Sequence, residues 1–466
     1  MSMLLQLYVL ACTGRRAPDT EVAPEVGDSQ LETAQPDTDT GEGVEVGDLS
    51  FERRPKNLLL IGIDTLRRDA LGRYGGGPDT PFLDGLFEQG VALDQHRSCS
   101  NYTFLSLVCT LTGRDGIDAG FVPLENESIP GDLPLLAGVL ADAGYARSLI
   151  YTNGFFAPTI GIPLDYDHVA EPDDLEANEV VALGLEHLDD MMTGSEPWFL
   201  HLHFMDPHLP YDPPEGYADT SNLGPIDWDF RTANHHVTGE IGDLWDDLEE
   251  EDQALVLAWA ETLYAGEVRW LDDQIQELFG ELESRGALDD TLVVIASDHG
   301  EAFFEHGEGA HGQTIYTGEN AAAAAFWTKD AASGGPGLKP LAHTGLTTLE
   351  DLLPTTLAAL GIAAPATTGL LVGDAPDDRL LLPFRAMKSG LTPSRIMIVG
   401  ERSGSRLHYW TDEGKVQLFE DGTDTDDVFT SPLDTEPAER LEAMEAVVQS
   451  ISELHPGQFD IEPPQD

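Results

Sequence analysis

The sequence predicts an α/β fold: a large, mostly parallel central sheet flanked by helices, followed by a small C-terminal subdomain of antiparallel strands and one helix. Two observations carry this prediction. Between residues 56 and 375, short continuous apolar runs alternate with segments of helical periodicity, as in parallel sheets with both faces covered. Beyond about residue 375, short apolar segments are separated by turn residues, which is typical of antiparallel strands. We therefore expect an α/β domain at 56–375 and a subdomain at 376–466.

The first 55 residues are interpreted as two non-globular segments. Residues 1–12 are apolar and end in Val-Leu-Ala-Cys, which resembles the end of a bacterial lipoprotein signal that is cut before a lipidated cysteine. This predicts an extracytoplasmic protein, in the periplasm or at the cell surface, tethered to a membrane through Cys12. Because no Lys or Arg precedes Arg15, a frayed apolar N-terminus is the alternative. Residues 13–55 are rich in Asp, Glu, Thr, Pro and Gly and predict a disordered acidic tether.

Four apolar runs are interpreted as strands buried in the parallel sheet. They are Asn57–Asp64, Ala146–Thr152, Trp198–Met205 and Thr291–Ala296. Apolar residues that recur every three or four positions predict the helices between and after them. These helices are Leu133–Ala143, Glu251–Ser284 and Thr348–Leu360.

The C-terminal subdomain is predicted from shorter segments. Its expected antiparallel strands are Arg395–Val399, Leu407–Trp410 and Val416–Phe419, with turns at Ser403-Gly404 and Glu413-Gly414. A last helix is expected over Pro437–Leu454. Outside residues 1–12 no segment approaches the roughly 18–20 continuous apolar residues of a membrane-spanning helix, so the body is expected to be soluble.

The charge balance excludes one class of partner. The chain has 85 Asp and Glu residues against 24 Lys and Arg residues, a net charge of −61. Nucleic acid is therefore not expected to bind, because a phosphate backbone requires a basic face. A solvated acidic surface is the simplest interpretation of this charge. If the substrate is an anion, a metal ion is the natural source of local positive charge.

Polar residues at the ends of three predicted strands indicate a site. Asp64 ends the first strand, Asp206 and His208 follow the third, and Asp298-His299 follow the fourth. Ligands of open α/β sheets bind at the carboxyl ends of the strands. A single aspartate there commonly caps a helix or turn, but three such ends favour a divalent metal site with oxygen and imidazole ligands, suited to Zn²⁺, Mn²⁺, Mg²⁺ or Ca²⁺.

The stretch Asn101–Arg114 supplies the attacking oxygen in this interpretation. Thr103 stands just before a predicted helix, Leu105–Thr112, whose free N–H groups would face an anion bound beside it. A metal ion can lower the pKa of a bound hydroxyl and make it a nucleophile. The alternative is that Thr103 only caps the helix. Cys99 and Cys109 could form a disulfide or remain two buried thiols.

The order of several motifs resembles the sulfatase branch of the alkaline phosphatase superfamily, from about Asn57 to Asp427. The matching segments are Asn57–Asp69, Thr80–Asp84, Leu111–Arg114, His203–His208, Ser297–Glu301, Glu305–Gly307, His311-Gly312 and Gln417–Asp421. The resemblance implies an alkaline-phosphatase-like sandwich and an ester hydrolase that needs one divalent cation or two.

Residue roles follow from the resemblance. Asp64, Asp298 and His299 would bind a divalent cation together with the nucleophile, which falls on Thr103. His208 would contact the oxygens of the sulfate or phosphate group, and His311 would lie near the leaving group, where either histidine could act as general acid. A second metal site could be formed by Asp206, His208 and His311. Three further residues would either line the cleft or pack in the core: Tyr211, Trp270 and His306.

The sequence departs from the sulfatase pattern at the nucleophile. Sulfatases carry a cysteine or serine there, converted to formylglycine within a Cys-X-Pro-X-Arg signature, whereas this chain has Thr103-Phe104-Leu105-Ser106-Leu107. A threonine nucleophile resembles those of the superfamily's phosphodiesterases and phosphoethanolamine-type transferases. We therefore expect hydrolysis of phosphate mono- or diesters of a small molecule, glycan or lipid. The alternatives are a headgroup transferase, a true sulfuric ester hydrolase and a catalytically inactive binding protein.

Overall fold

The structure is a computed structural model that describes residues 43–75, 80–124, 127–172, 176–387, 394–402, 405–419, 438–459 and 461–464. Several predictions fall outside these ranges. They are the lipoprotein-type signal with Cys12, the tether up to residue 42, the turn at Ser403-Gly404 and the end of the family resemblance beyond Phe419. Within the described ranges, no helix combines the length and apolar character needed to cross a membrane.

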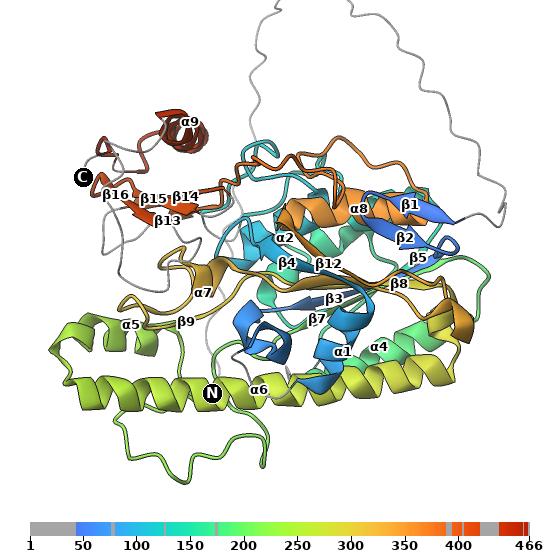
Figure 1. Cartoon of the computed structure of the whole chain (residues 1–466), viewed down its shortest axis with the longest axis horizontal. Coiled ribbons are helices and arrows are strands. Elements are labelled where there is room, and N and C mark those ends of the chain that lie inside the picture. The colour runs from blue at the N-terminus through green and yellow to red at the C-terminus, as the bar shows by residue number, and fades with distance from the viewer. Residues whose placement is uncertain are drawn as a thin grey trace, which may run out of the picture. The chain divides into compact units, whose positions relative to one another are not determined.

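A large sheet forms the centre of the α/β domain and confirms the predicted fold class (Figure 1). Within the described residues its eight strands lie in the order β12 (Leu341–Thr348), β4 (Val91–Arg97), β11 (Ala324–Trp327), β8 (Thr291–Ser297), β3 (Asn57–Ile63), β7 (Trp198–Phe204), β5 (Ala146–Ile150) and β6 (His168–Ala170). The pairs from β8 to β6 are all parallel, β11 is antiparallel to both of its neighbours, and β12 is parallel to β4. The sheet is therefore mostly parallel.

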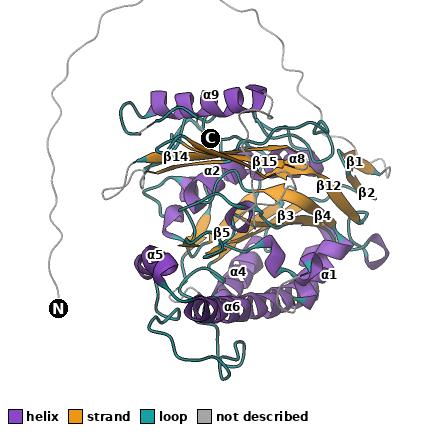
Figure 2. Ribbon diagram, turned by 60° about the vertical axis from the view of Figure 1, so that its left-hand side comes forward, coloured by secondary structure: helices purple, strands orange, loops and turns teal. Residues whose placement is uncertain are grey.

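Strand β3 shows why both faces of the sheet are covered. Leu58 and Leu60 point into one hydrophobic core, whereas Leu59, Ile61 and Ile63 point into another. Successive side chains of a strand face opposite sides, so a continuous apolar run requires helices on both. The first core is covered by α2 (Thr103–Thr112), α3 (Leu136–Asp142) and α8 (Leu352–Leu360). The second is covered by α1 (Pro81–Gln89), α4 (Ala177–Met191) and α6 (Glu250–Ser284), as Figures 1 and 2 show.

The C-terminal subdomain is an antiparallel sheet with one helix, as predicted. Its strands are β13 (Phe384–Met387), β14 (Arg395–Arg402), β15 (Ser405–Trp410) and β16 (Lys415–Phe419). The helix α9 (Ala438–Leu454) packs on this sheet through Met444, Val448 and Ile451. The sequence did not predict β13.

Two contacts attach the subdomain to the loop that leads into α2. The Phe384 N–H donates a hydrogen bond of 3.0 Å to the carbonyl oxygen of Cys99. The buried Arg97 donates to both carboxylate oxygens of Glu401 at 2.8 and 2.9 Å, and Arg406 donates to the same carboxylate. A buried ion pair is stable only when its hydrogen bonds are satisfied. Because Arg97 belongs to β4 and Glu401 to β14, these hydrogen bonds fix the position of β14 against β4.

The N-terminal part of the structure corrects the predicted end of the tether. Residues expected to be disordered up to 55 instead form a hairpin of β1 (Val44–Val46) and β2 (Leu49–Phe51). Leu49 and Phe51 are buried in the core. The acidic composition of residues 13–55 hid two short alternating segments, Val-Glu-Val and Leu-Ser-Phe, which are joined by a turn at Gly47 with φ of 54°.

The remaining elements lie on the loops around the carboxyl ends of the parallel strands. They are α5 (His235–Leu244), β9 (Ala302–Phe303), β10 (Gly309–Ala310) and α7 (Thr317–Asn320). The buried Glu319 of α7 accepts hydrogen bonds from the Asn101 side-chain amide (2.7 Å) and the Gly312 N–H (3.0 Å). Residues 319–326 are buried, and through Glu319 they hold two site loops.

Candidate active site

Asp64 and Asp298 lie side by side at the carboxyl ends of adjacent parallel strands. Ile63 of β3 pairs with Ser297 of β8, so the next residue of each strand reaches the same edge of the sheet. The ligand atoms of Asp64, Asp298 and His299 all lie within 4.8 Å of one another. The structure thus brings together three of the four predicted metal ligands.

Thr103, the fourth, is the first residue of α2. Its Oγ1 lies 3.2 Å from Nε2 of His299, and its side chain is buried. Tyr102, not Thr103, occupies the N-cap position, and no side chain caps this helix. The interpretation of Thr103 as a plain N-cap is therefore wrong, and its hydroxyl points into the site.

The buried atoms of this group fit a divalent cation. Among the described residues, Asp64 Oδ1, Asp298 Oδ2 and Thr65 Oγ1 are buried and have no hydrogen-bond partner. Buried polar atoms are almost always satisfied, and two unsatisfied carboxylate oxygens beside an imidazole match the ligands that divalent metals take in proteins. Asp64, Asp298, His299 and Thr103 would hold the cation.

Electrostatics make the pair of carboxylates dependent on added positive charge. Burial and then the charge of Asp64 raise the pKa of Asp298 well above its usual value. Burial opposes ionisation of Asp64 too, but the neighbouring histidines, chiefly His208, and the Asn153 amide lower its pKa overall. A cation between the two would favour ionisation of both.

Hydrogen bonds outside the group fix its orientation. The Asn153 side-chain amide donates to Asp64 Oδ2 at 2.7 Å, and the N–H groups of Thr65 and His299 donate to Asp298 Oδ1 at 3.1 and 2.7 Å. Nδ1 of His299 faces the carbonyl oxygen of Gly300 at 2.8 Å, so Nδ1 carries the hydrogen and Nε2 keeps its lone pair for a metal ion. Burial lowers the pKa of His299 to about 4, so this ring is neutral at neutral pH.

Three further histidines form a second cluster beside the first. The ligand atoms of His208, His235 and His311 lie within 4.8 Å of one another, and the ring centroid of His311 is 4.6 Å from that of His299. Nδ1 of His311 lies 2.9 Å from Glu301 Oε1, and Nδ1 of His208 contacts the carbonyl oxygen of Leu209. The rings of His208 and His311 therefore both keep Nε2 available. Burial and then the neighbouring histidines lower the pKa of His311 well below its usual value.

Asp206 is not part of this cluster, in contrast to the predicted second metal site. Asp206 is buried beside Glu267 of α6. Burial, and to a smaller extent the charge of Asp206, raises the pKa of Glu267 to about 9. Burial raises the pKa of Asp206 to about 6. The rule that ligands bind at the carboxyl ends of parallel strands, here called the strand-end rule, locates Asp206 near the site but does not determine the direction of its side chain. The residue that joins His208 and His311 is instead His235, at the start of α5.

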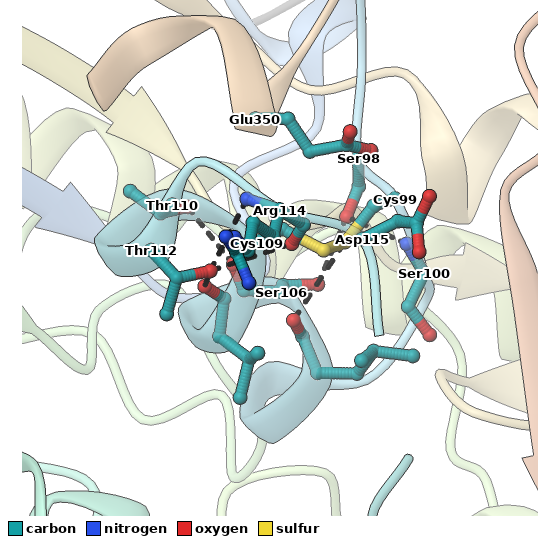
Figure 3. Close-up of a disulfide and its surroundings, with 12 residues drawn as sticks. Ser98, Cys99, Ser100, Ser106, Cys109, Thr110, Thr112, Arg114, Asp115 and Glu350 are labelled. Atoms are coloured by element: carbon teal, nitrogen blue, oxygen red, sulfur yellow. Dashed lines mark hydrogen bonds between the residues drawn. A yellow bond between two sulfur atoms is a disulfide. The ribbon is translucent and has the colours of Figure 1, made fainter. Parts of the chain in front are cut away.

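A disulfide brackets Thr103. Cys99 lies in the loop before α2 and Cys109 in its last turns, and the two sulfur atoms are bonded (Figure 3). The hydroxyls of Ser98 and Ser106 lie 2.9 Å apart across the same loop. Of the two alternatives for the cysteines, the structure contains the disulfide, which ties the second half of α2 to the loop between β4 and α2.

Sequence reasoning missed four residues that contact the predicted ones. Asn153 follows β5, so the strand-end rule could have found it. His203 lies in a motif noted above, and its Nε2 is 3.8 Å from Asp64 Oδ2. Glu301 also lies in a noted motif, Ser297–Glu301, whereas His235 carries no legible local signal. Of the residues with two interpretations, Tyr211 is buried against Phe230, Tyr264 and Phe303, Trp270 packs on Tyr217, and His306 stacks on Tyr316.

Comparisons with known sequences and structures agree with this geometry. The sequence profile of the sulfatase family matches residues 56–362, more than half of the chain. An arylsulfatase of Clostridium perfringens is 26% identical over 192 residues, which cover 40% of this chain and 38% of that protein. Human arylsulfatase D is 38% identical over 105 residues, which cover 20% of this chain and 18% of that protein. The matched segments thus span less than half of the length of these relatives.

Solved structures resemble the fold over most of its length. A phosphonate monoester hydrolase from Silicibacter pomeroyi superposes with a TM-score of 0.63 at 20% identity, covering 87% of this chain and 96% of that one. A protein solved with its substrate, D-glucosamine-2-N,6-O-disulfate, superposes with a TM-score of 0.67 at 16% identity, covering 87% and 99%. At these identities the likeness concerns the fold, while the profile match over residues 56–362 identifies the family. The chain belongs to the sulfatase family.

Proposed function

We propose that the protein is a metal-dependent ester hydrolase in which Thr103 Oγ1 is the nucleophile, and that its substrate is a phosphate ester. One observation carries the proposal. The Thr103 hydroxyl points at Nε2 of His299 from 3.2 Å, beside the unsatisfied oxygens of Asp64 and Asp298. Threonine cannot be converted to the formylglycine that sulfatases use, so the hydroxyl itself must attack.

The residues of the chain divide the work as follows. A divalent cation held by Asp64, Asp298 and His299 would lower the pKa of the Thr103 hydroxyl and draw charge from the ester group. The first N–H groups of α2, which is ten residues long, face an anion bound beside Thr103. The hydroxyl displaces the alcohol and forms a phosphothreonine, which water then hydrolyses to restore Thr103 and release phosphate.

His208 and His311 are placed to assist the leaving group. Their Nδ1 atoms are engaged with Leu209 and Glu301, so Nε2 of each ring is the atom that can hold a proton near the ester. The negative charge of a bound substrate raises the pKa of an adjacent imidazole and opposes the effect of burial on His311. We assign the proton transfer to the leaving oxygen to this pair.

As an alternative to this proton transfer, the cluster of His208, His235 and His311 could hold a second cation through the same Nε2 atoms, because three imidazoles within 4.8 Å are a known zinc ligand set that leaves one position open. Two cations would favour a phosphate ester, whose attacking and leaving oxygens they can both stabilise. A sulfuric ester hydrolase is the second candidate, favoured by the sulfatases among the relatives.

We also propose an extracytoplasmic location. The Cys99–Cys109 disulfide supports it, since disulfides persist in oxidising compartments, and so does the lipoprotein-type N-terminus. A Cys12→Ala variant expressed in a bacterial host should move from the membrane fraction to the soluble fraction. An unchanged distribution would contradict the lipid tether.

The proposed activity is tested by elemental analysis of the purified chain together with parallel assays on an aryl phosphomonoester, an aryl phosphodiester and an aryl sulfate. We expect at least one bound divalent cation per chain and a higher kcat/KM for a phosphate ester than for the sulfate. A higher value for the sulfate would establish the second candidate. Metal-free, inactive protein would indicate a binding protein, and an acceptor adduct among the products would indicate a transferase.

A further inference from the structure

Arg385 brings a positive charge from the C-terminal subdomain to the start of α2. It lies in β13, the strand whose Phe384 N–H donates to Cys99, in the loop that precedes Thr103. The guanidinium carbon lies over the ring of Tyr102, 3.7 Å from its centroid, and Tyr102 directly precedes Thr103. Stacking of this kind holds a guanidinium in place while leaving its N–H groups free.

Arg385 is unusual among the arginines because it makes no hydrogen bond and no ion pair with any residue that the structure describes. Every other arginine in the described ranges donates at least one hydrogen bond, such as Arg97 to Glu401 or Arg395 to the carbonyl oxygen of Gln313. Nε of Arg385 is buried without a partner. Glu319, whose charge reaches Arg385, directs its carboxylate to Asn101 and Gly312 instead.

The unpaired guanidinium remains charged. Burial lowers the pKa of Arg385 to about 10, an effect that Tyr102 and Glu319 partly offset. An uncompensated buried charge is destabilising, and proteins retain one chiefly where function needs it.

The charge of Arg385 acts on the same histidines that surround Thr103. Burial lowers the pKa of His299 and of His311, and the charge of Arg385 lowers both further. Together with the stacking of Arg385 on Tyr102, these effects indicate a positive charge near the start of α2 and within electrostatic reach of both imidazoles. Position 107, where the sulfatase signature would have an arginine, holds a buried leucine.

We propose that Arg385 is a substrate-binding residue that donates hydrogen bonds to the non-bridging oxygens of the anionic group attacked by Thr103. The inference rests on the proposed function in one respect, namely that the site accepts an anionic ester. It assigns to the C-terminal sheet a part in the active site, because the strand that carries Arg385 belongs to that sheet. A planar guanidinium can donate two parallel hydrogen bonds to such a group.

The test is the binding of inorganic phosphate to the full, metal-loaded chain, measured by calorimetry for the wild type, Arg385→Gln and Arg402→Gln. Arg402 lies on the neighbouring strand β14 and is bound to the exposed Glu439, so its replacement makes the same change in net charge away from the site. We expect Arg385→Gln to weaken phosphate binding by about 10- to 100-fold, the loss of a charged hydrogen bond. Arg402→Gln should bind phosphate as the wild type does.

Three measurements separate binding from a structural role. Because Arg385 makes no hydrogen bond with any residue in the described ranges, Arg385→Gln should have an unchanged or raised unfolding midpoint and an unchanged metal content. Arg385→Lys, which keeps the charge but loses the fork of donors, should bind with intermediate affinity. Added guanidinium ion at low concentration should partly restore phosphate binding to Arg385→Ala.

Two results would overturn the proposal. One is Arg385→Gln protein that binds phosphate with wild-type affinity. The other is a loss of phosphate binding that occurs together with a loss of folding in both Arg385→Gln and Arg385→Lys. Failure of the proposed function gives a different pattern. In that case the protein turns over no ester, but replacing Arg385 still weakens phosphate binding. This weakening is seen both in the otherwise wild-type chain and in the Thr103→Ala background.

Discussion

The adjacent carboxyl groups of Asp64 and Asp298 are suited to hold a cation. Both are buried, and burial and the charge of Asp64 raise the pKa of Asp298, which favours a proton on the metal-free pair. Metal ligands must be deprotonated to bind. Loading of the site is therefore coupled to release of the proton from this pair.

Metal affinity should accordingly rise with pH. The raised pKa of Asp298 favours its protonated form in the free site, whereas a metal ligand must be ionised, so a higher pH favours loading. We expect the affinity to rise between about pH 6 and pH 8, by up to about tenfold per pH unit, with protons released on loading. Competition with a chelating dye at each pH measures the affinity. A flat profile would contradict the shared proton.

Asn153 should matter for metal affinity although it binds no metal. Its amide hydrogen bond of 2.7 Å orients Asp64 and favours its ionised form. We expect Asn153→Ala to weaken metal binding by about 10- to 100-fold, as measured by the same dye competition. Asn178→Ala, an exposed change on α4, is the matched control. Equal affinities for the two variants would remove Asn153 from the site.

At the scale of residues, sequence patterns located most of the site but not its side-chain directions. Asp64, Asp298 and His299 were found because the carboxyl ends of adjacent parallel strands must meet. Asp206 satisfied the same rule, yet its carboxyl lies beside Glu267, a residue of a helix 61 positions later. Such a contact depends on tertiary packing, as do those of His235 and Arg385, and leaves no local pattern to be read.

The loop before α2 is held by the Cys99–Cys109 disulfide, which joins it to the second half of the helix, and by the hydrogen bond from Phe384 to Cys99. Both fix the loop that presents Thr103 to His299. This arrangement places the nucleophile on a rigid element rather than on a free loop. Precise presentation of the attacking atom is a large part of enzymatic rate enhancement.

Removal of the disulfide should therefore lower both stability and activity. We expect the double variant Cys99→Ala, Cys109→Ala to lose about 2–4 kcal/mol of unfolding free energy, measured by denaturant titration. Its kcat should fall while its metal content, held mainly by Asp64, Asp298 and His299, stays the same. Wild-type kcat in the double variant would show that the disulfide does not position Thr103.

The elements that the sequence did not predict share a physical reason. β11 is a run of small residues, Ala324-Ala325-Phe326-Trp327, next to further alanines that favour helices as much as strands. β4 and β12 lie towards one end of the sheet and mix polar with apolar residues, so neither forms a continuous apolar run. Their pairing across the chain, not their local sequence, makes them strands.

At the scale of the whole molecule, the net charge of −61 opposes the approach of an anionic substrate. In the account proposed above, positive charge within the site comes from a bound cation and from Arg385. Long-range repulsion is screened by salt, because the Debye length falls from about 30 Å at 0.01 M to about 8 Å at 0.15 M ionic strength. Screening should act on the approach of the substrate more than on the contacts within the buried site.

The kcat/KM for an anionic ester should therefore rise several-fold between these ionic strengths, in contrast to enzymes that attract their substrates. The change should appear in KM, with kcat nearly constant. A steady-state series in NaCl measures it. A fall in kcat/KM over this range would mean that the face around the site is positive, against the charge of the chain as a whole.

The sequence patterns were sufficient for the architecture of the molecule: the parallel core of the sheet, the helices on both faces and the antiparallel C-terminal sheet. They depend on hydrophobic periodicity, which reports burial directly. The predicted boundary at residue 375 separates two parts that are in contact, however, since β13 brings Arg385 to Tyr102.

The central claim is that Thr103 is the nucleophile of a metal-dependent hydrolase, and turnover by Thr103→Ala tests it most directly. With metal content matched to the wild type, we predict a loss of at least about 1,000-fold in kcat/KM on the preferred aryl phosphate ester, because no other described hydroxyl is hydrogen-bonded to His299. Thr103→Ser should retain part of the activity, since it keeps the attacking oxygen. Wild-type turnover by metal-loaded Thr103→Ala would contradict the account.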